Sequence, residues 1–183
     1  MKPITTEASL ESTAFAPEAN DALNDIAKWI KQTNPSGLER NASELSNRGY
    51  RVLFNGPAGS GRKTTAALFG KQFQKPVYRI ELSTIVSKYI GETEKNIAAV
   101  FEKAKAKDWI LFFDEAEALF GKRTDVKDAH DKYANQEINY LLQKLEQHPG
   151  LTIVSSNMKS NIDEAFKRRF NTVVRFPSIE LKK

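Results

Sequence analysis

The sequence predicts an α/β fold in which a five-stranded parallel sheet lies between two layers of helices. Two observations predict this fold class. From residue 51 onward, segments with strand patterns alternate with segments with helix patterns, which implies helical crossovers between parallel strands. The segments 109–113 (WILFF) and 151–155 (LTIVS) are almost continuously apolar, as is typical of strands covered on both faces.

The individual elements follow from the spacing of apolar and helix-breaking residues. Apolar residues recur at helical spacing after Pro17, and the Asn-Pro pair at 34–35 stops that helix. A second, weaker helix is predicted over 38–46. The strands predicted after it are 51–54, 77–82, 109–113, 151–155 and 172–176, and the helices are 62–73, 92–106, 129–147 and a short one from residue 163.

The chain has 183 residues, which suits one domain at a prior of roughly 150 residues per domain. Residues 1–16 lack periodicity and are expected to form a flexible leader. Residues 17–48 are expected to form helices that pack on the core, and residues 49–183 the core itself.

Composition excludes several classes of protein. With 40% hydrophobic and 28% charged residues, the chain can bury a core and is not disordered as a whole. Its longest wholly apolar run, 109–113, is far too short to span a bilayer, and Glu7 and Glu11 interrupt any secretion signal. No membrane association is expected. The absence of cysteine excludes disulfides and fits a cytoplasmic compartment.

The net charge of +5 allows two interpretations. A basic surface can bind phosphates or nucleic acid, or it can simply solvate helix ends. No basic stretch interleaved with aromatic residues is visible, so nucleic acid is the least favoured partner.

A glycine-rich loop follows the first predicted strand of the core and leads directly into a helix. Such a loop turns its backbone N–H groups toward a phosphate, and the helix N-terminus adds partial positive charge. The strand-loop-helix setting favours phosphate binding over a simple turn. The candidate phosphate-binding residues are Gly56, Pro57, Ala58, Gly59, Ser60, Gly61, Arg62, Lys63 and Thr64.

The loop departs from the usual pattern G-x-x-x-x-G-K-[ST] after Gly61. In the gapless register, Arg62 occupies the lysine position and Lys63 the Ser/Thr position that normally gives Mg²⁺ its hydroxyl ligand. An ammonium cannot ligate a metal, so this register predicts weak Mg²⁺ binding and slow hydrolysis. In the alternative register the loop bulges by one residue, and Lys63-Thr64 serve as the usual pair. The spacing from Gly56 to Gly61 is ordinary, which modestly favours the gapless register.

Two acidic residues follow the apolar strand 109–113, at the carboxyl end where open α/β sheets bind ligands. The natural roles are Asp114 holding Mg²⁺ through water and Glu115 orienting and deprotonating an attacking water. Asn157 follows the next strand, and its amide is placed to hold a water against the terminal phosphate, although a turn-forming asparagine is the simpler alternative.

Together these motifs resemble the AAA+ ATPases, in particular the branch with spastin-, katanin- and proteasome-like subunits. The resemblance covers about 49–177 and rests on GPAGSG, ILFFDEAEALFGKR, SSN and NIDEAFKRRF, in that order along the chain. It implies a P-loop NTPase fold, ATP or ADP bound with Mg²⁺ between neighbouring subunits, and a homo-oligomeric, hexameric ring.

The resemblance also gives meaning to two further segments. The residues Lys88, Tyr89, Ile90 and Gly91 look like the first pore loop, whose aromatic residue grips a threaded polypeptide in the central channel. Arg168 and Arg169 look like the arginine fingers that one subunit supplies to its neighbour. The structural alternatives are a tyrosine packed on its own domain and a solvated basic pair.

The helical lid that family members carry after this core has no counterpart up to Lys183. We therefore expect weakened nucleotide binding and assembly, with a monomer possible for this form of the chain. The segment 125–131 collects three carboxylates and a histidine, but its spacing does not suit a tetrahedral metal site. His148 is predicted to be a helix-end residue that interacts with the helix dipole.

Two hypotheses follow for function. The first is an ATP-hydrolysing, ring-forming motor that remodels or threads a protein substrate. The second is a nucleotide-regulated assembly or scaffold protein with weak or no hydrolysis, which the atypical residues Arg62 and Lys63 favour.

Overall fold

A computed structural model describes residues 2–7, 17–33, 49–82, 92–117, 129–157, 162 and 164–177. Within them, six strands form one sheet in the order β1-β3-β4-β5-β2-β6. The strands are β1 (Lys2–Ile4), β2 (Tyr50–Asn55), β3 (Val77–Glu81), β4 (Ile110–Asp114), β5 (Leu151–Ser156) and β6 (Thr172–Arg175). The helices are α1 (Pro17–Thr33), α2 (Arg62–Phe73), α4 (Glu92–Lys107), α6 (Ala129–Gln147) and the single turn α7 (Glu164–Lys167).

The sheet confirms the predicted α/β class. It differs from the predicted five-stranded sheet by one additional strand at an edge. The five strands β2 to β6 pair in parallel with one another, as expected. The sixth strand, β1, pairs antiparallel with β3, so part of the expected flexible leader is ordered instead. Three residues carry no readable periodicity, and Pro3 disfavours a strand except at a sheet edge, which is where β1 lies.

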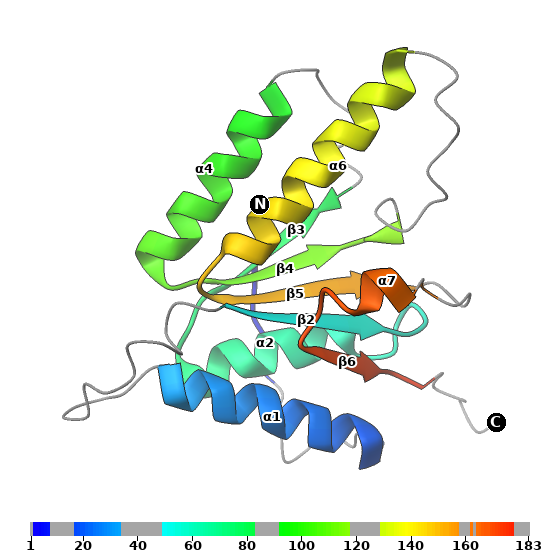
Figure 1. The fold of residues 1–183 in the computed structure, drawn as a ribbon. Helices are drawn as coiled ribbons and strands as arrows, with labels where there is room; N and C mark the ends of the chain where they lie inside the picture. Colours follow the sequence, from blue (N-terminus) through cyan, green and yellow to red (C-terminus); the bar gives the residue numbers. More distant parts are fainter. Residues whose placement is uncertain are drawn as a thin grey trace.

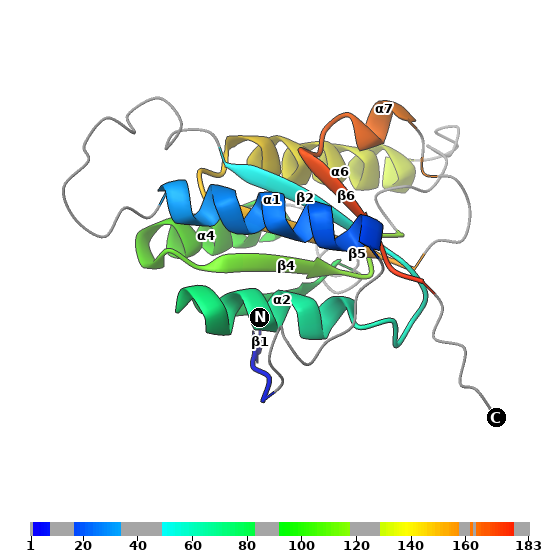
Figure 2. The ribbon, with the colours of Figure 1, turned by 90° about the horizontal axis from the view of Figure 1, so that it is seen from below.

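Helices cover both faces of the sheet (Figures 1 and 2): α4 and α6 lie on one face, α1 and α2 on the other. The side chains of β4 alternate between the two layers. Leu111 and Phe113 belong to the core under α4 and α6, whereas Ile110 and Phe112 belong to the core under α1 and α2. This alternation explains the continuous apolar run, because every residue of β4 is buried.

The amino-terminal helix α1 packs on the core through Leu23, Ile26 and Ile30. The predicted helix over 38–46 lies outside the described residues. Among the helices that the structure describes, none is both long and apolar enough to cross a membrane.

The parallel strands bring their carboxyl ends to one edge of the sheet. Register pairs Asn55 of β2 with Ser156 of β5, and Glu81 of β3 with Asp114 of β4. The glycine-rich loop, the acidic pair and Asn157 therefore emerge at the same edge, because each follows one of these strands.

The opposite edge, where the strands begin, is closely packed. The Tyr78 and Trp109 rings stack with their centroids 3.8 Å apart. A Cβ on Gly49 would lie 1.8 Å from the carbonyl oxygen of His148, so only glycine fits there. His148 itself is buried, and desolvation lowers its pKa to about 4. The imidazole is neutral at pH 7, which argues against the predicted interaction with the helix dipole because that interaction needs the charged form.

Candidate functional site

The glycine-rich loop between β2 and α2 has the geometry of an anion cradle. Gly59 and Gly61 have φ angles of 79° and 92°, a left-handed conformation that side chains rarely adopt. Gly61 caps α2 with no side-chain hydrogen bond. The first N–H groups of a helix have no partner inside it, so those of α2 are available to a ligand.

Two further features of the loop fit a polyphosphate. Ser60 Oγ is buried without a hydrogen-bond partner among the described residues, so a ligand oxygen can satisfy it. Gly56 lies so close to Phe176 that an added Cβ would be 2.6 Å from the Phe176 carbonyl oxygen. The loop is therefore held against the start of the chain segment after β6, which fixes the path of the loop.

A cleft of about 370 Å³ lies between the loop and the carboxyl ends of β3, β4 and β5. It brings together most of the predicted site residues. Gly56 and Pro57 are not among those lining it. The lining residues are Ala58, Gly59, Ser60, Gly61, Arg62, Lys63, Thr64, Arg79, Phe112, Asp114, Glu115, Glu117, Ser155 and Asn157.

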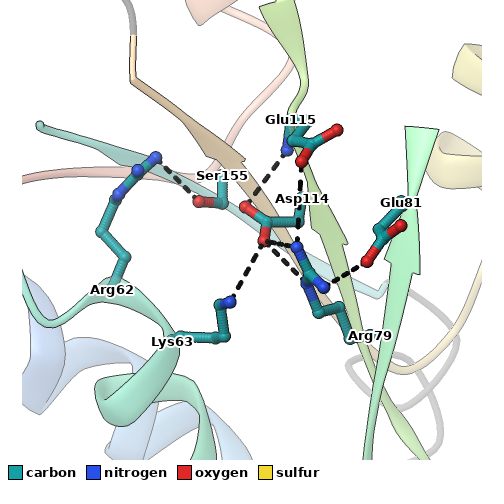
Figure 3. Close-up of polar contacts among 7 residues, drawn as sticks. All are labelled: Arg62, Lys63, Arg79, Glu81, Asp114, Glu115 and Ser155. Atoms are coloured by element: carbon teal, nitrogen blue, oxygen red, sulfur yellow. Dashed lines mark hydrogen bonds and ion pairs between the residues drawn. The ribbon is translucent and has the colours of Figure 1, made fainter. Parts of the chain in front are cut away.

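Asp114, the last residue of β4, has both carboxylate oxygens engaged by the protein (Figure 3). Oδ2 accepts hydrogen bonds from Nε of Arg79 at 2.7 Å and also lies 2.7 Å from its Nη2. Oδ1 accepts a hydrogen bond from the backbone N–H of Glu115 at 3.1 Å. Arg79 also pairs with Glu81, so it bridges the ends of β3 and β4.

Glu115 is set apart from the other acidic residues of the cleft by its backbone. Its φ of 59° is left-handed, an uncommon conformation that is found disproportionately at functional sites. Its carboxylate is half-exposed, and Oε1 is 3.9 Å from Arg79 Nη2. A carboxylate at the cleft that water can reach has the exposure that a general base needs.

Arg62 and Lys63, at the start of α2, reach different sides of the cleft (Figure 3). Arg62 Nη1 donates a hydrogen bond to Ser155 Oγ at 2.9 Å. Burial lowers the pKa of the Arg62 guanidinium, and the carboxylates of Asp114 and Glu117 oppose this effect. Lys63 Nζ lies 3.9 Å from Asp114 Oδ2. This contact with Asp114 favours the gapless register, in which Lys63 occupies the Ser/Thr position.

Asn157 lies at the cleft, where its backbone N–H donates a hydrogen bond to Glu117 Oε1 at 2.5 Å. The sequence analysis missed two charged residues of the cleft, Arg79 and Glu117. Both had a signal: Arg79 stands two residues before the carboxyl end of its strand, and Glu117 follows the acidic pair by two residues. Strand ends of a parallel sheet meet at one edge, so each charged residue near such an end was a candidate.

Arg168 and Arg169 do not line this cleft. They precede β6 and lie near the edge where the strands begin. Arg169 pairs with Glu146, and its carbonyl oxygen accepts a hydrogen bond from Arg51 Nε at 2.8 Å. Their action on a neighbouring subunit stays a prediction. The candidate pore loop at 88–91 lies outside the described residues, as do the side chains of 125–131.

The donor set fits a nucleotide polyphosphate but does not fit Mg²⁺. In the gapless register an ammonium stands where the family pattern has a hydroxyl ligand, and the carboxylate expected to hold the metal is already bound by Arg79. In the described part of the chain, no group of three or more acidic or histidine side chains forms an alternative metal site.

Comparison with known proteins agrees with this geometry. The model of the ATPase family associated with various cellular activities (AAA) matches residues 52–178, more than half of the chain. One relative, an uncharacterized AAA family ATPase y4kL of Sinorhizobium fredii, is 34% identical over 143 residues, which cover 75% of this chain and 43% of the relative. Proteasome-activating nucleotidase 2 of Halobacterium salinarum is 31% identical over 134 residues, 69% of this chain and 33% of the relative.

The chain thus spans less than half the length of these relatives. Among solved structures, the FIGL-1 AAA domain in complex with ADP superposes with a TM-score of 0.68. That match covers 97% of this chain and 58% of the other, at 22% identity, and so supports the fold.

Proposed function

This chain belongs to the ATPase family associated with various cellular activities, and we propose that it binds the phosphates of ATP or ADP in the cleft at the start of α2. We further propose that it hydrolyses ATP slowly as part of a ring that remodels a protein substrate. The observation that carries the proposal is the uncapped N-terminus of α2, which faces Asp114, Glu115 and Asn157 across one cleft.

The chemistry assigned to the cleft uses groups of this chain alone. The N–H groups of the loop and of the first turn of α2 bind phosphate oxygens. The half-exposed carboxylate of Glu115 orients a water and takes its proton as that water attacks the terminal phosphate. The Asn157 side chain holds the same water from the end of β5. Mg²⁺, which the family resemblance implies, has no suitable donor set here and takes no part in the proposal.

The proposals of a ring and of a protein substrate are based on family membership and on the segments 88–91 and 168–169. A relative is named as a proteasome-activating nucleotidase, which supports a protein substrate for this chain as well. In the proposal, Tyr89 of the segment 88–91 grips a polypeptide because an aromatic ring buries area without demanding particular hydrogen bonds. Arg168 and Arg169 would then act on the nucleotide of the next subunit. A cytoplasmic location, supported by the lack of cysteine, is part of the same proposal.

A second candidate function is a nucleotide-regulated assembly that does not turn ATP over. The positions of Lys63 and Arg79 favour it, because both place positive charge against Asp114. In this case nucleotide binding alone changes the interface between subunits, and the chain works as a switchable scaffold.

The proposal is tested by ATP turnover measured against ATP concentration, with an unfolded polypeptide, with DNA, or alone. We expect slow, saturable turnover that the polypeptide stimulates and DNA does not. Tyr89→Ala should remove the stimulation and spare the basal rate, whereas Tyr89→Phe, which keeps the ring, should retain both. Binding without turnover, together with a nucleotide-dependent mass in light scattering, would favour the scaffold. Stimulation by DNA would instead identify a nucleic-acid remodeller.

A further inference from the structure

We propose that the nucleotide is bound here as the metal-free polyphosphate anion, with the ammonium group of Lys63 providing the counter-charge that Mg²⁺ would otherwise supply. The inference rests on the proposed nucleotide binding and specifies the chemical form of the ligand. Three observations carry it: the residue at the hydroxyl position, the partners of Asp114, and the set of cations that line the cleft.

Lys63, the second residue of α2, occupies the position where the family pattern has a Ser or Thr hydroxyl that ligates Mg²⁺. Lys63 has no lone pair to offer a metal, because a protonated ammonium only donates hydrogen bonds. Its Nζ already lies 3.9 Å from Asp114 Oδ2, the carboxylate that the family pattern assigns to the metal. A dication brought to this place would be repelled by the ammonium at short range.

The carboxylate of Asp114 is already bound by other groups of the protein, so a metal gains little by binding it. Its side chain is only 12% exposed, and Arg79 binds Oδ2 from Nε and Nη2 at 2.7 Å. Its other oxygen accepts the N–H of Glu115. The charge of this carboxylate is therefore compensated by the protein itself (Figure 3), and a hydrated cation would have to break a charge-assisted pair to reach it.

Lys63 is placed to serve a phosphate as well as Asp114. Its side chain is 52% exposed and lines the same cleft as the glycine-rich loop. A lysine stem is flexible, so the ammonium can turn from Asp114 toward a phosphate oxygen at small cost. Arg62 and Arg79 line the cleft too, but Arg62 donates a hydrogen bond to Ser155 Oγ, and Arg79 is bound by Asp114 and Glu81. Lys63 has the longest of these contacts, so it is the cation that a polyphosphate can recruit most easily.

This arrangement makes a distinctive prediction about added magnesium. In solution Mg²⁺ neutralises part of the charge of a nucleotide, which weakens its attraction to Lys63, Arg62 and Arg79. Magnesium should then leave the affinity unchanged or reduce it, whereas a site with a hydroxyl at position 63 should bind more tightly when the metal is present.

The test is the binding of ADP to the whole chain, followed by calorimetry in excess EDTA and in excess Mg²⁺. ADP is used because its binding is read without any hydrolysis. The unaltered chain should bind ADP at least as tightly in EDTA as in Mg²⁺. Lys63→Thr should lose about tenfold in EDTA, since a charge-assisted hydrogen bond is removed, and should gain about tenfold when Mg²⁺ is added.

Two further variants make the result specific to Lys63. Lys63→Gln keeps a good helix former without charge or hydroxyl, and should lose affinity in EDTA without gaining a response to Mg²⁺. Lys28→Thr removes the same charge from α1, where Lys28 pairs with exposed Asp25, and should change neither affinity. Circular dichroism checks that each variant is folded.

The alternatives give separate results. If the unaltered chain binds ADP tenfold more tightly in Mg²⁺ than in EDTA, the metal-free form is wrong while the proposed nucleotide binding stands. If both Lys63 variants bind ADP in EDTA as tightly as the unaltered chain, the metal-free form is also wrong and the proposed nucleotide binding again stands. If neither the chain nor its variants bind ADP in either buffer, the proposed function itself is wrong.

Discussion

The two edges of the parallel sheet differ in how their charged side chains are arranged. At the carboxyl edge the cleft of about 370 Å³ is lined by three cations and three carboxylates, several of them half-exposed. At the amino edge a smaller hollow of about 170 Å³ is lined by apolar side chains such as Trp29 and Trp109, by the charged residues Lys75, Lys105 and Asp108, and by the buried imidazole of His148, which is neutral at pH 7. Charged residues at that edge, such as Lys75 and Asp108, pair with each other at the rim.

This difference indicates that the carboxyl edge serves ligand binding and that the amino edge contributes mainly to stability. Close packing at the amino edge joins β3 to the start of β4, where the Tyr78 and Trp109 rings stack. The carboxyl edge carries the glycine-rich loop and the half-exposed side chains of Lys63 and Glu115, which a ligand can reach. Removing charge at the carboxyl edge should therefore change chemistry, and removing a group at the amino edge should change stability.

The largest expected effect is that of Glu115→Gln on turnover. The amide keeps the size of the side chain but cannot take a proton, so hydrolysis of radiolabelled ATP under single-turnover conditions should fall by about 100-fold or more. Affinity for ADP should change little, because Glu115 is half-exposed and not part of the phosphate loop. The urea midpoint should also stay the same.

The matching control is Glu117→Gln, which removes a neighbouring carboxylate of the same cleft. Glu117 accepts the N–H of Asn157, and an amide oxygen accepts it more weakly than a carboxylate does, so this variant should lower turnover less and slightly lower the urea midpoint. Equal losses of turnover in both variants would mean that Glu115 is not distinguished as the base.

The next effect is a loss of stability in acid that originates at the amino edge. The folded pKa of His148 is about 4, below the ordinary 6.5, so between these values the unfolded chain binds a proton that the folded chain does not. This contribution is fully favourable above pH 6.5 and is lost as the pH falls toward 4. Urea unfolding at pH 7.5 and pH 4.5 should show a loss of about 2 to 3 kcal/mol from this group.

His148→Leu isolates that contribution from the carboxylates, which also titrate in acid. The variant has no imidazole to protonate, so its loss between the two pH values should be smaller by the same amount. ADP affinity at pH 7.5 should be unaffected, since His148 lies at the opposite edge from the cleft. Identical acid losses in the two proteins would show that His148 is protonated without cost in the fold.

The smallest expected effect separates the two arginines before β6. Arg169 pairs with Glu146, and both side chains are 43% exposed, so Arg169→Ala should lower the free energy of unfolding by at most about 1 kcal/mol. Arg168 is exposed and makes no ion pair with a described residue, so Arg168→Ala should lie within about 0.5 kcal/mol of the unaltered chain. Urea unfolding measures the free energy of unfolding of both variants. A larger loss for Arg168→Ala than for Arg169→Ala would contradict the prediction that Arg169 contributes more to stability.

Much of the fold could be predicted because its signals are local. The apolar run of β4 and the glycine-rich loop before α2 each specify their own structure, and order along the chain then brings Asp114 and Lys63 to one edge. The contacts that escaped prediction join distant segments through side chains. Arg79 bridges two strand ends, and although its place near a strand end marks it as a cleft candidate, its sequence neighbours do not indicate that its partner is Asp114.

The antiparallel strand β1 has a consequence for the order in which the sheet is completed during synthesis. Residues 2–4 leave the ribosome before any of the strands that form the interior of the sheet, yet their partner is residues 77–79 of β3. Until β3 has emerged and paired with β4, β1 has no template, so it must wait and then close the edge late. Its arrival covers an open row of backbone groups that would otherwise recruit a strand from another chain. Residues 2–4 thus cover part of the edge of β3 that could otherwise pair with a strand of another chain.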